Sequence, residues 1–277
     1  MATVEHGPKQ LTADGSVPGD VPDMNGAAAR TPLARRWFAD PRHGPLPVLL
    51  LLLTANTGVV DAVSILSLGR VFVANMTGNV VFVGFAVAGA PGFSLSASLW
   101  ALAGFVAGAY AGGLLIRSSI GSHRGNLFAV ALLVETLMLG GALIVSIAAG
   151  RTLSMVEDDI IAAGVAIGLG LQNAIVRRLA VPDLTTTVLT MTLTGIAADV
   201  PAGDRGPTIV RRAAAVVTML VGAIVGALLV IHLGRSEGLA VAVALVAVTA
   251  TAAVTAARGH KAWHSYTASA DGVPRHG

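Results

Sequence analysis

Cysteine and charge are the two things this chain lacks most clearly. None of its 277 residues is a cysteine, which excludes disulfides, thiolate metal sites and a cysteine nucleophile. Charged residues make up only 12% of the chain, whereas soluble domains carry about 25%. Hydrophobic residues make up 54%, and the mean hydropathy is +0.76. This composition indicates an integral membrane protein whose first partner is the lipid bilayer.

Motifs for catalysis and cofactor binding are also missing. There is no phosphate loop ending in Lys-Ser or Lys-Thr, no His-Glu-x-x-His and no Gly-x-Ser-x-Gly elbow. The histidines near apolar runs have no partner at metal-site spacing. The net charge of +3 comes with no basic patch interleaved with aromatic residues. We therefore expect no enzyme activity, no metal, no cofactor and no nucleic-acid partner.

The two ends of the chain differ from its middle. Residues 1–44 are rich in Pro, Gly, Asp and Ala and show no apolar periodicity, which predicts a disordered tail. Residues 258–277 are polar again. Basic residues beside the apolar region place both tails in the cytoplasm by the positive-inside rule. These residues are Arg35, Arg36, Arg42, Arg258 and Lys261.

Eight apolar runs lie between the tails. A helix needs about 20 residues to cross the hydrocarbon core, and most of the runs are long enough. The second contains Asn-Met-Thr-Gly-Asn at 75–79, and the sixth is rich in threonine with an acid at each end. Neither resembles an ordinary lipid-facing span. The runs are 45–69, 71–90, 97–116, 126–149, 159–176, 184–200, 209–233 and 236–257.

The two halves of the chain resemble each other. A shift of about 112–114 residues aligns "GVVDAV" (58–63) with "GLQNAI" (170–175), so that Asp61 meets Asn173. It also aligns "VAGAYAGGLL" with "LVGAIVGALL". An internal duplication follows, with one membrane repeat at 45–149 and a second at 157–257.

The arginines distinguish two topologies. If all eight runs cross, the outside loops hold six arginines and the inside loops four, against the positive-inside rule. If the second and sixth runs enter the membrane without crossing, seven lie inside and three outside. We therefore predict an all-α polytopic protein with six transmembrane helices and two re-entrant segments, eight full spans being the alternative. The seven inside arginines are Arg117, Arg124, Arg177, Arg178, Arg205, Arg211 and Arg212.

Three spans in each repeat would invert the halves relative to each other. Inverted repeats with broken helices are a common construction of secondary transporters, and polar backbone is tolerated only beside protein or a water-filled cavity. We therefore expect the polar groups of the two odd segments to meet near the midplane and form a substrate or ion pathway. Its candidate residues are Asp61, Asn75, Thr77, Asn79, Asn173, Thr190 and Thr192.

Two stretches carry a resemblance to a known family. "VDAVSILSLGRVFVANMTGNVVFVG" and "GLQNAIVRRLAVPDLTTTVLTMTLT" resemble the two signature regions of the YoaK-like family. The similarity extends over most of residues 47–257. The resemblance implies a bacterial inner-membrane protein with a domain of unknown function, and it implies no substrate. The family's second signature reads Thr-Gly-Thr, whereas Met191 occupies the glycine position here.

Two carboxylates fall inside apolar runs. Glu135 lies about 13 Å into the fourth run, where an ionised carboxylate costs several kcal/mol. It is either a proton relay or a neutral acid that hydrogen-bonds a neighbouring helix. Asp61 either contributes charge to a cation site or caps the turn before the second run.

Small-residue ladders predict close helix packing, within the chain or between the protomers of a homo-oligomer. They are Gly104, Gly108, Gly112, Gly222 and Gly226. The function we expect is transport of a small polar solute or ion, with proton coupling through Glu135. A membrane scaffold without transport activity and a passive channel are the alternatives.

Overall fold

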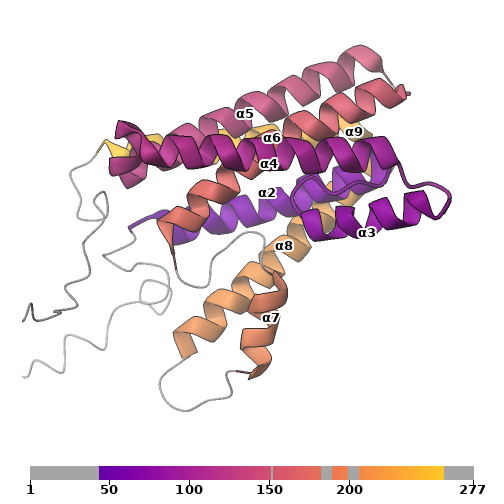
Figure 1. The fold of residues 1–277 in the computed structure, drawn as a ribbon. Helices are drawn as coiled ribbons and strands as arrows, with labels where there is room; N and C mark the ends of the chain where they lie inside the picture. The colour runs from indigo at the N-terminus through magenta and orange to yellow at the C-terminus, as the bar shows by residue number, and fades with distance from the viewer. Residues whose placement is uncertain (1–43, 151, 182–188, 199–205, 259–277) are drawn as a thin grey trace, which may run out of the picture.

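The computed structural model describes residues 44–150, 152–181, 189–198 and 206–258 (Figure 1). Within these ranges the protein is all-helical and has no strand. The predicted tails lie outside the described residues, apart from Gly44 and Arg258. The long helices are α2 (Leu46–Ser67), α4 (Leu95–Arg117), α5 (Arg124–Ala149), α6 (Met155–Leu179), α8 (Gly206–His232) and α9 (Arg235–Ala257). The short ones are α3 (Met76–Val87), the 3₁₀ turn η2 (Ser119–Ser122) and α7 (Leu189–Ala198).

Six helices are long and apolar enough to cross a membrane, each with 22 to 26 residues. They are the six runs predicted to cross, so the expectation of an all-α polytopic protein is confirmed to that extent. The 12 residues of α3 and the 10 of α7 span only about 18 and 15 Å. A hydrocarbon core is about 30 Å thick, so neither short helix can cross it alone. Consecutive long helices alternate in direction (Figure 1).

Local sequence explains where several helices begin and end. Ser154 and Glu157 form a capping box at the start of α6, each satisfying a backbone N–H of the other. The side chain of Ser94 accepts a hydrogen bond from the N–H of Ala97 at the start of α4. Gly150, which follows α5, has a φ of 72° that favours glycine.

The centre of the molecule is built around α2 and α6. These two helices are the most buried of the six spans, and in the other four a third or fewer of the residues are buried. α4 packs most extensively on α6, and α2 on α8. Each of these two pairs joins a helix from the first half of the chain to a helix from the second half.

Glycine sets the distance between α4 and α6. A Cβ added at Gly108 would overlap the carbonyl oxygen of Ile167, and one added at Gly170 would overlap that of Phe105. At Gly104 an added Cβ would lie 2.6 Å from the carbonyl oxygen of Ala163. The backbones therefore touch directly, which membrane helices achieve only with small residues.

Glycine has the same role between α2 and α8. A Cβ at Gly222 would overlap the carbonyl oxygen of Ala55, and one at Gly58 would overlap that of Met219. At Gly226 an added Cβ would lie 2.7 Å from the carbonyl oxygen of Val59. The predicted glycine ladders thus make contacts within the chain. A homo-oligomer through these helices stays a prediction.

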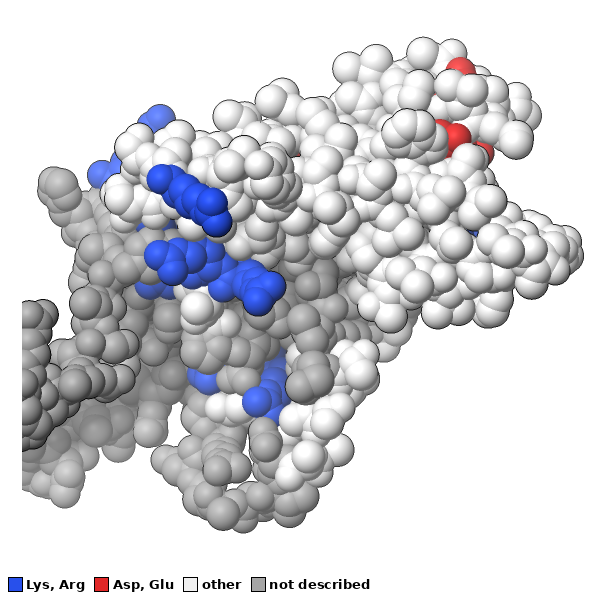
Figure 2. Space-filling model, in the orientation of Figure 1, with Lys and Arg blue, Asp and Glu red and all other residues white. Residues whose placement is uncertain are grey.

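Charge is divided between the two ends of the helix bundle. Figure 2 shows most of the visible Lys and Arg side chains at one end and the visible Asp and Glu side chains at the other, where Arg235 also lies near Asp158. Among the described residues, the basic end holds the carboxyl ends of α4, α6 and α9 and the amino ends of α5 and α8. Its arginines are Arg117, Arg124, Arg177, Arg178, Arg211, Arg212 and Arg258. Arg124 also ties two helices together, because its Nη2 donates to the carbonyl oxygen of Leu179 at 2.7 Å.

Substitution of Gly108 by alanine tests the close approach. Because the added Cβ would overlap backbone rather than a flexible side chain, we expect Gly108→Ala to lower the free energy of unfolding by about 1–3 kcal/mol. Gly113→Ala on the same helix is the control, because nothing lies within 4 Å of its added Cβ. Thermal unfolding of both variants in the same detergent measures the difference. Equal melting temperatures would contradict the packing described here.

Candidate functional site

The chain turns back into the molecule after α2 ends. Gly69 and Arg70 both adopt positive φ, at 68° and 57°. The N–H groups of Val73 and Ala74 then donate to Oδ1 of Asp61, at 3.2 and 3.1 Å. Asp61 lies six residues before the end of α2, about 9 Å back along that helix. Residues 68–75 therefore run back beside α2 before α3 begins.

Asn75 and Asn79 complete the hydrogen bonding of this returning segment. The amide of Asn75 donates to Oδ2 of Asp61. Oδ1 of Asn79 accepts from the N–H of Phe72 at 2.8 Å, and its Nδ2 donates to the carbonyl oxygen of Phe72 at 2.6 Å. Backbone that is not helical has no internal partners, and leaving it unpaired in lipid costs several kcal/mol per group. The polar residues supply the partners that this segment lacks.

The other members of the cluster have different environments. Thr77 is exposed. Gly78 lies directly under the ring of Phe72, which a Cβ at that position would overlap. The ring of Phe72 stacks on that of Phe82 with centroids 5.4 Å apart. The segment and α3 are thus held to each other by one ring stack and one amide.

Glu135 is the second buried carboxyl group. It lies near the middle of α5, is 1% exposed, and its Oε1 accepts a hydrogen bond from Nδ2 of Asn56 on α2 at 3.2 Å. Asn56 is fully buried. Within the described part of the chain, Oε2 of Glu135 is buried and has no hydrogen-bond partner.

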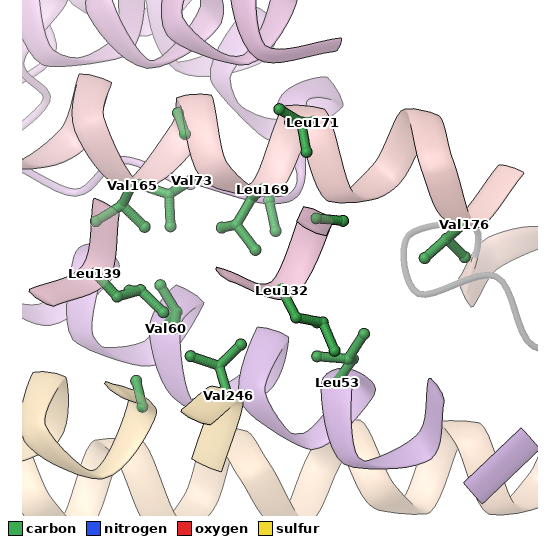
Figure 3. Close-up of a cluster of buried hydrophobic side chains, with 14 of the residues drawn as sticks. Leu53, Val60, Val73, Leu132, Leu139, Val165, Leu169, Leu171, Val176 and Val246 are labelled. Carbon is green, nitrogen blue, oxygen red and sulfur yellow. The ribbon is translucent and has the colours of Figure 1, made fainter. Parts of the chain in front are cut away.

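Apolar side chains close both sides of the Asn56–Glu135 pair. Leu53 and Leu132 lie one turn before the two residues on their helices, and Val60 and Leu139 lie one turn after them. All four are at most 1% exposed and belong to the same buried cluster. Figure 3 shows Leu53 beside Leu132, and Val60 beside Leu139. The polar pair therefore has buried apolar side chains on both sides along the two helices.

The polar candidates of the second half are spread over two helices. Nδ2 of Asn173 on α6 donates to the carbonyl oxygen of Leu169 at 2.9 Å. On α7, Thr190 is exposed and Thr192 is buried. The threonine-rich stretch 182–188 lies outside the described residues.

The structure brings some of the predicted residues together and keeps others apart. Asp61, Asn75 and Asn79 all hold the segment between α2 and α3. Thr190 and Thr192 do not join them, because α3 packs on α4 whereas α7 packs on α8. Figure 1 shows the two short helices apart. Near the middle of α5, the side chain of Glu135 contacts that of Asn56 instead.

Sequence reasoning missed two residues of the interior. Neither Asn56 nor Gln172 is among the residues predicted to form the pathway. Both are at most 1% exposed. A usable signal existed, since each is an amide within an apolar run and a membrane-buried carboxyl group requires such a partner. In the described parts of the chain, no group of three His, Cys, Asp or Glu side chains could hold a metal ion.

Comparison with known proteins gives a family and one curated relative. The family model described as "Protein of unknown function (DUF1275)" matches residues 49–252, from the first turns of α2 into α9. The chain is 31% identical over 188 residues to the UPF0700 transmembrane protein YoaK of Bacillus subtilis (strain 168). This match covers 65% of the chain and 82% of that protein. No solved structure matches.

The Asp61–Asn75 hydrogen bond can be tested by exchanging its partners. Because Oδ1 of Asp61 accepts two backbone N–H groups, Asp61→Asn would place an amide NH₂ against the amide of Asn75. We expect this variant to lose about 1–3 kcal/mol of stability. The double variant Asp61→Asn/Asn75→Asp restores a donor and an acceptor, and we expect it to recover part of the loss in a thermal unfolding assay. A double variant no more stable than the single one would contradict the proposed role.

Proposed function

Because the chain belongs to the family of proteins of unknown function DUF1275, we propose its function from its architecture: a transporter of a small polar solute or ion built from two inverted repeats. Its coarser description as an integral membrane protein rests on the six long apolar helices and the transmembrane relative. The finer proposal rests mainly on one observation, the repetition of the glycine contacts in the two halves.

The glycine contacts repeat at constant shifts. Adding 112 to Gly58 gives Gly170, and adding 114 to Phe105 gives Met219. Gly58 faces the carbonyl oxygen of Met219, and Gly170 faces that of Phe105. The contact of α2 with α8 is thus the contact of α6 with α4, with the halves exchanged.

A second pair of contacts obeys the same shifts. Gly222 faces the carbonyl oxygen of Ala55, and Gly108 faces that of Ile167. Gly222 lies 114 residues after Gly108, and Ile167 lies 112 after Ala55. Two independent pairs of contacts related in this way support a duplicated structure with a pseudo-twofold axis between its halves.

Inversion of the repeats is supported by helix direction. α2 and α6 run in opposite directions, as do α4 and α8 (Figure 1). Each half has three long helices and one short helix between its first and second spans. In this account α3 and α7 are re-entrant, and the return of residues 73–75 to the level of Asp61 supports this for the first half.

Orientation follows from the arginine-rich end. The positive-inside rule puts that end, and both termini with it, on the cytoplasmic side of a bacterial inner membrane. The acidic end then faces outward, with Glu157, Asp158, Asp159 and Glu237.

Transport is the activity that this architecture suits. Inverted repeats with interrupted helices place substrate and coupling-ion sites near the midplane, at the interface of the repeats. Glu135 is a buried ionisable group at that depth, and such groups mark ion and proton pathways. Asp61, Asn75 and Asn79 position the re-entrant segment, while Asn173, Thr190 and Thr192 supply polar groups in the second half. Thr77 is exposed on α3, where it can line an entry to the pathway.

Uptake by reconstituted protein tests this proposal. Vesicles containing the full chain would be given a panel of radiolabelled small polar solutes, with an imposed proton gradient and after its dissipation by an uncoupler. We expect saturable uptake of at least one solute that falls when the gradient is removed. Glu135→Gln should abolish the dependence on the gradient, whereas Glu157→Gln, at the exposed start of α6, should preserve it.

The two alternatives predict different results in the same assay. A passive channel gives flux that neither saturates nor responds to the uncoupler. A scaffold gives no flux above that of empty vesicles, with variants that alter only stability. Either result would contradict a coupled transporter.

A further inference from the structure

Four buried polar atoms at the centre of the molecule have no hydrogen-bond partner among the described residues. They belong to three amide or carboxyl groups, each at most 1% exposed. An unpaired buried polar group costs about 1–3 kcal/mol, so a cluster of them in an apolar core requires a reason. The atoms are Oδ1 of Asn56, Oε2 of Glu135, and Oε1 and Nε2 of Gln172.

Gln172 lies on the face of α6 that meets Glu135. The contact point is Gly168, where an added Cβ would lie 3.2 Å from the Cα of Glu135. Gln172 follows Gly168 by four residues and therefore shares its face. Long side chains on a helix lean toward its amino end. From this position the amide of Gln172 can reach back over Gly168 toward Glu135, although it is not hydrogen-bonded to the Glu135 carboxyl group in the structure.

We propose that Asn56, Glu135 and Gln172 form one proton-binding site at the interface of the two repeats. The inference deepens the transport function proposed above and rests on it. Asn56 and Glu135 come from the first half of the chain, and Gln172 comes from the second. A proton bound there is therefore held jointly by the two parts that move relative to each other in an alternating-access cycle.

The three side chains can satisfy both states of the carboxyl group. Nδ2 of Asn56 donates to Oε1 in either state. When Glu135 is ionised, a change of the Gln172 rotamer would let its Nε2 donate to Oε2, a hydrogen bond that the structure itself does not contain. When a proton adds to Oε2, the new O–H donates to Oε1 of Gln172 after its amide rotates. An amide offers both a hydrogen-bond donor and an acceptor. An apolar side chain at position 172 offers neither.

A proton fits this site better than a metal ion. Oxygen-binding cations such as Ca²⁺ and Mg²⁺ take six or more ligands. The free oxygens here number three, one on each side chain. Leu53 with Leu132, and Val60 with Leu139, place apolar side chains one turn before and one turn after the Asn56–Glu135 pair (Figure 3). A single proton requires only one new hydrogen bond.

Other charged groups on the packed helices lie away from Glu135. On α2 the nearest is Asp61, whose oxygens are taken by Val73, Ala74 and Asn75. On α6, Asp159 and Arg177 lie nine residues to either side of Gly168. On α9 the charges are confined to the first turn, at Arg235 and Glu237. Protonation of Glu135 is therefore what sets the net charge of this site.

Infrared spectroscopy of the full chain in lipid vesicles tests the site without a substrate. The chain has four glutamates, and labelling them with ¹³C at the carboxyl carbon identifies the stretching band of a protonated glutamic acid as the pH is stepped from acid to alkaline. We expect one such band with the narrow width of a buried group, lost in Glu135→Gln and retained in Glu157→Gln. Gln172→Leu should shift it to higher frequency, because the O–H loses its acceptor.

The outcomes separate the site from the transport function. A labelled protein without a narrow glutamic acid band at any pH overturns the proton site, and this reading needs no variant that might misfold. A band that survives in Glu135→Gln, or one unmoved by Gln172→Leu, also overturns it. The band together with absent solute uptake would support the proton site and reject transport. Uptake without the band would do the reverse.

Discussion

The arrangement depends on the close approach of backbones at glycine. Lipid gives helices no hydrophobic reason to associate, so packing distance decides which helices pair. Gly58 and Gly222 bring α2 onto α8, and Gly108 and Gly170 bring α4 onto α6. These two crossings join the halves of the chain and bury α2 and α6 at the centre. The positions of Asn56 on α2 and Gln172 on α6 follow from them, as does the contact of Gly168 with Glu135.

A second constraint is that every backbone polar group within the bilayer requires a partner. The stretch between α2 and α3 is not helical, and its N–H groups at residues 72–74 are satisfied by Asp61 and Asn79. One carboxylate and two amides therefore allow the chain to turn back beside α2. The same chemistry can serve transport, because a segment held by a few side-chain hydrogen bonds can be released by breaking them. The polar residues of this segment have a structural role that does not depend on a bound solute.

The sequence predicted the number and positions of the long helices because hydropathy and helix length are local properties. It also predicted that Glu135 lies buried in the membrane interior. The sequence could not predict the partner of Glu135, because Asn56 lies 79 residues away along the chain. A uniformly apolar run also does not reveal which face of a helix meets a neighbouring helix. The sequence also led us to expect that the two polar clusters meet. They do not, because α3 packs on α4 whereas α7 packs on α8. The sequence identified the glycine ladders as packing surfaces, but it did not predict which helices pack against them.

Thiol labelling tests the inverted, re-entrant topology most directly, because the chain has no native cysteine. Ala88 follows α3 and Ser122 precedes α5, and both are exposed. Single cysteines at these positions would be labelled in intact cells with a membrane-impermeant reagent, with permeabilised cells showing that each site is reactive. Labelling of intact cells at 88 and not at 122 is the result expected when α3 enters and leaves on the same side. Labelling at 122 and not at 88 would mean that α3 crosses the membrane, and the inverted repeats proposed here would be wrong.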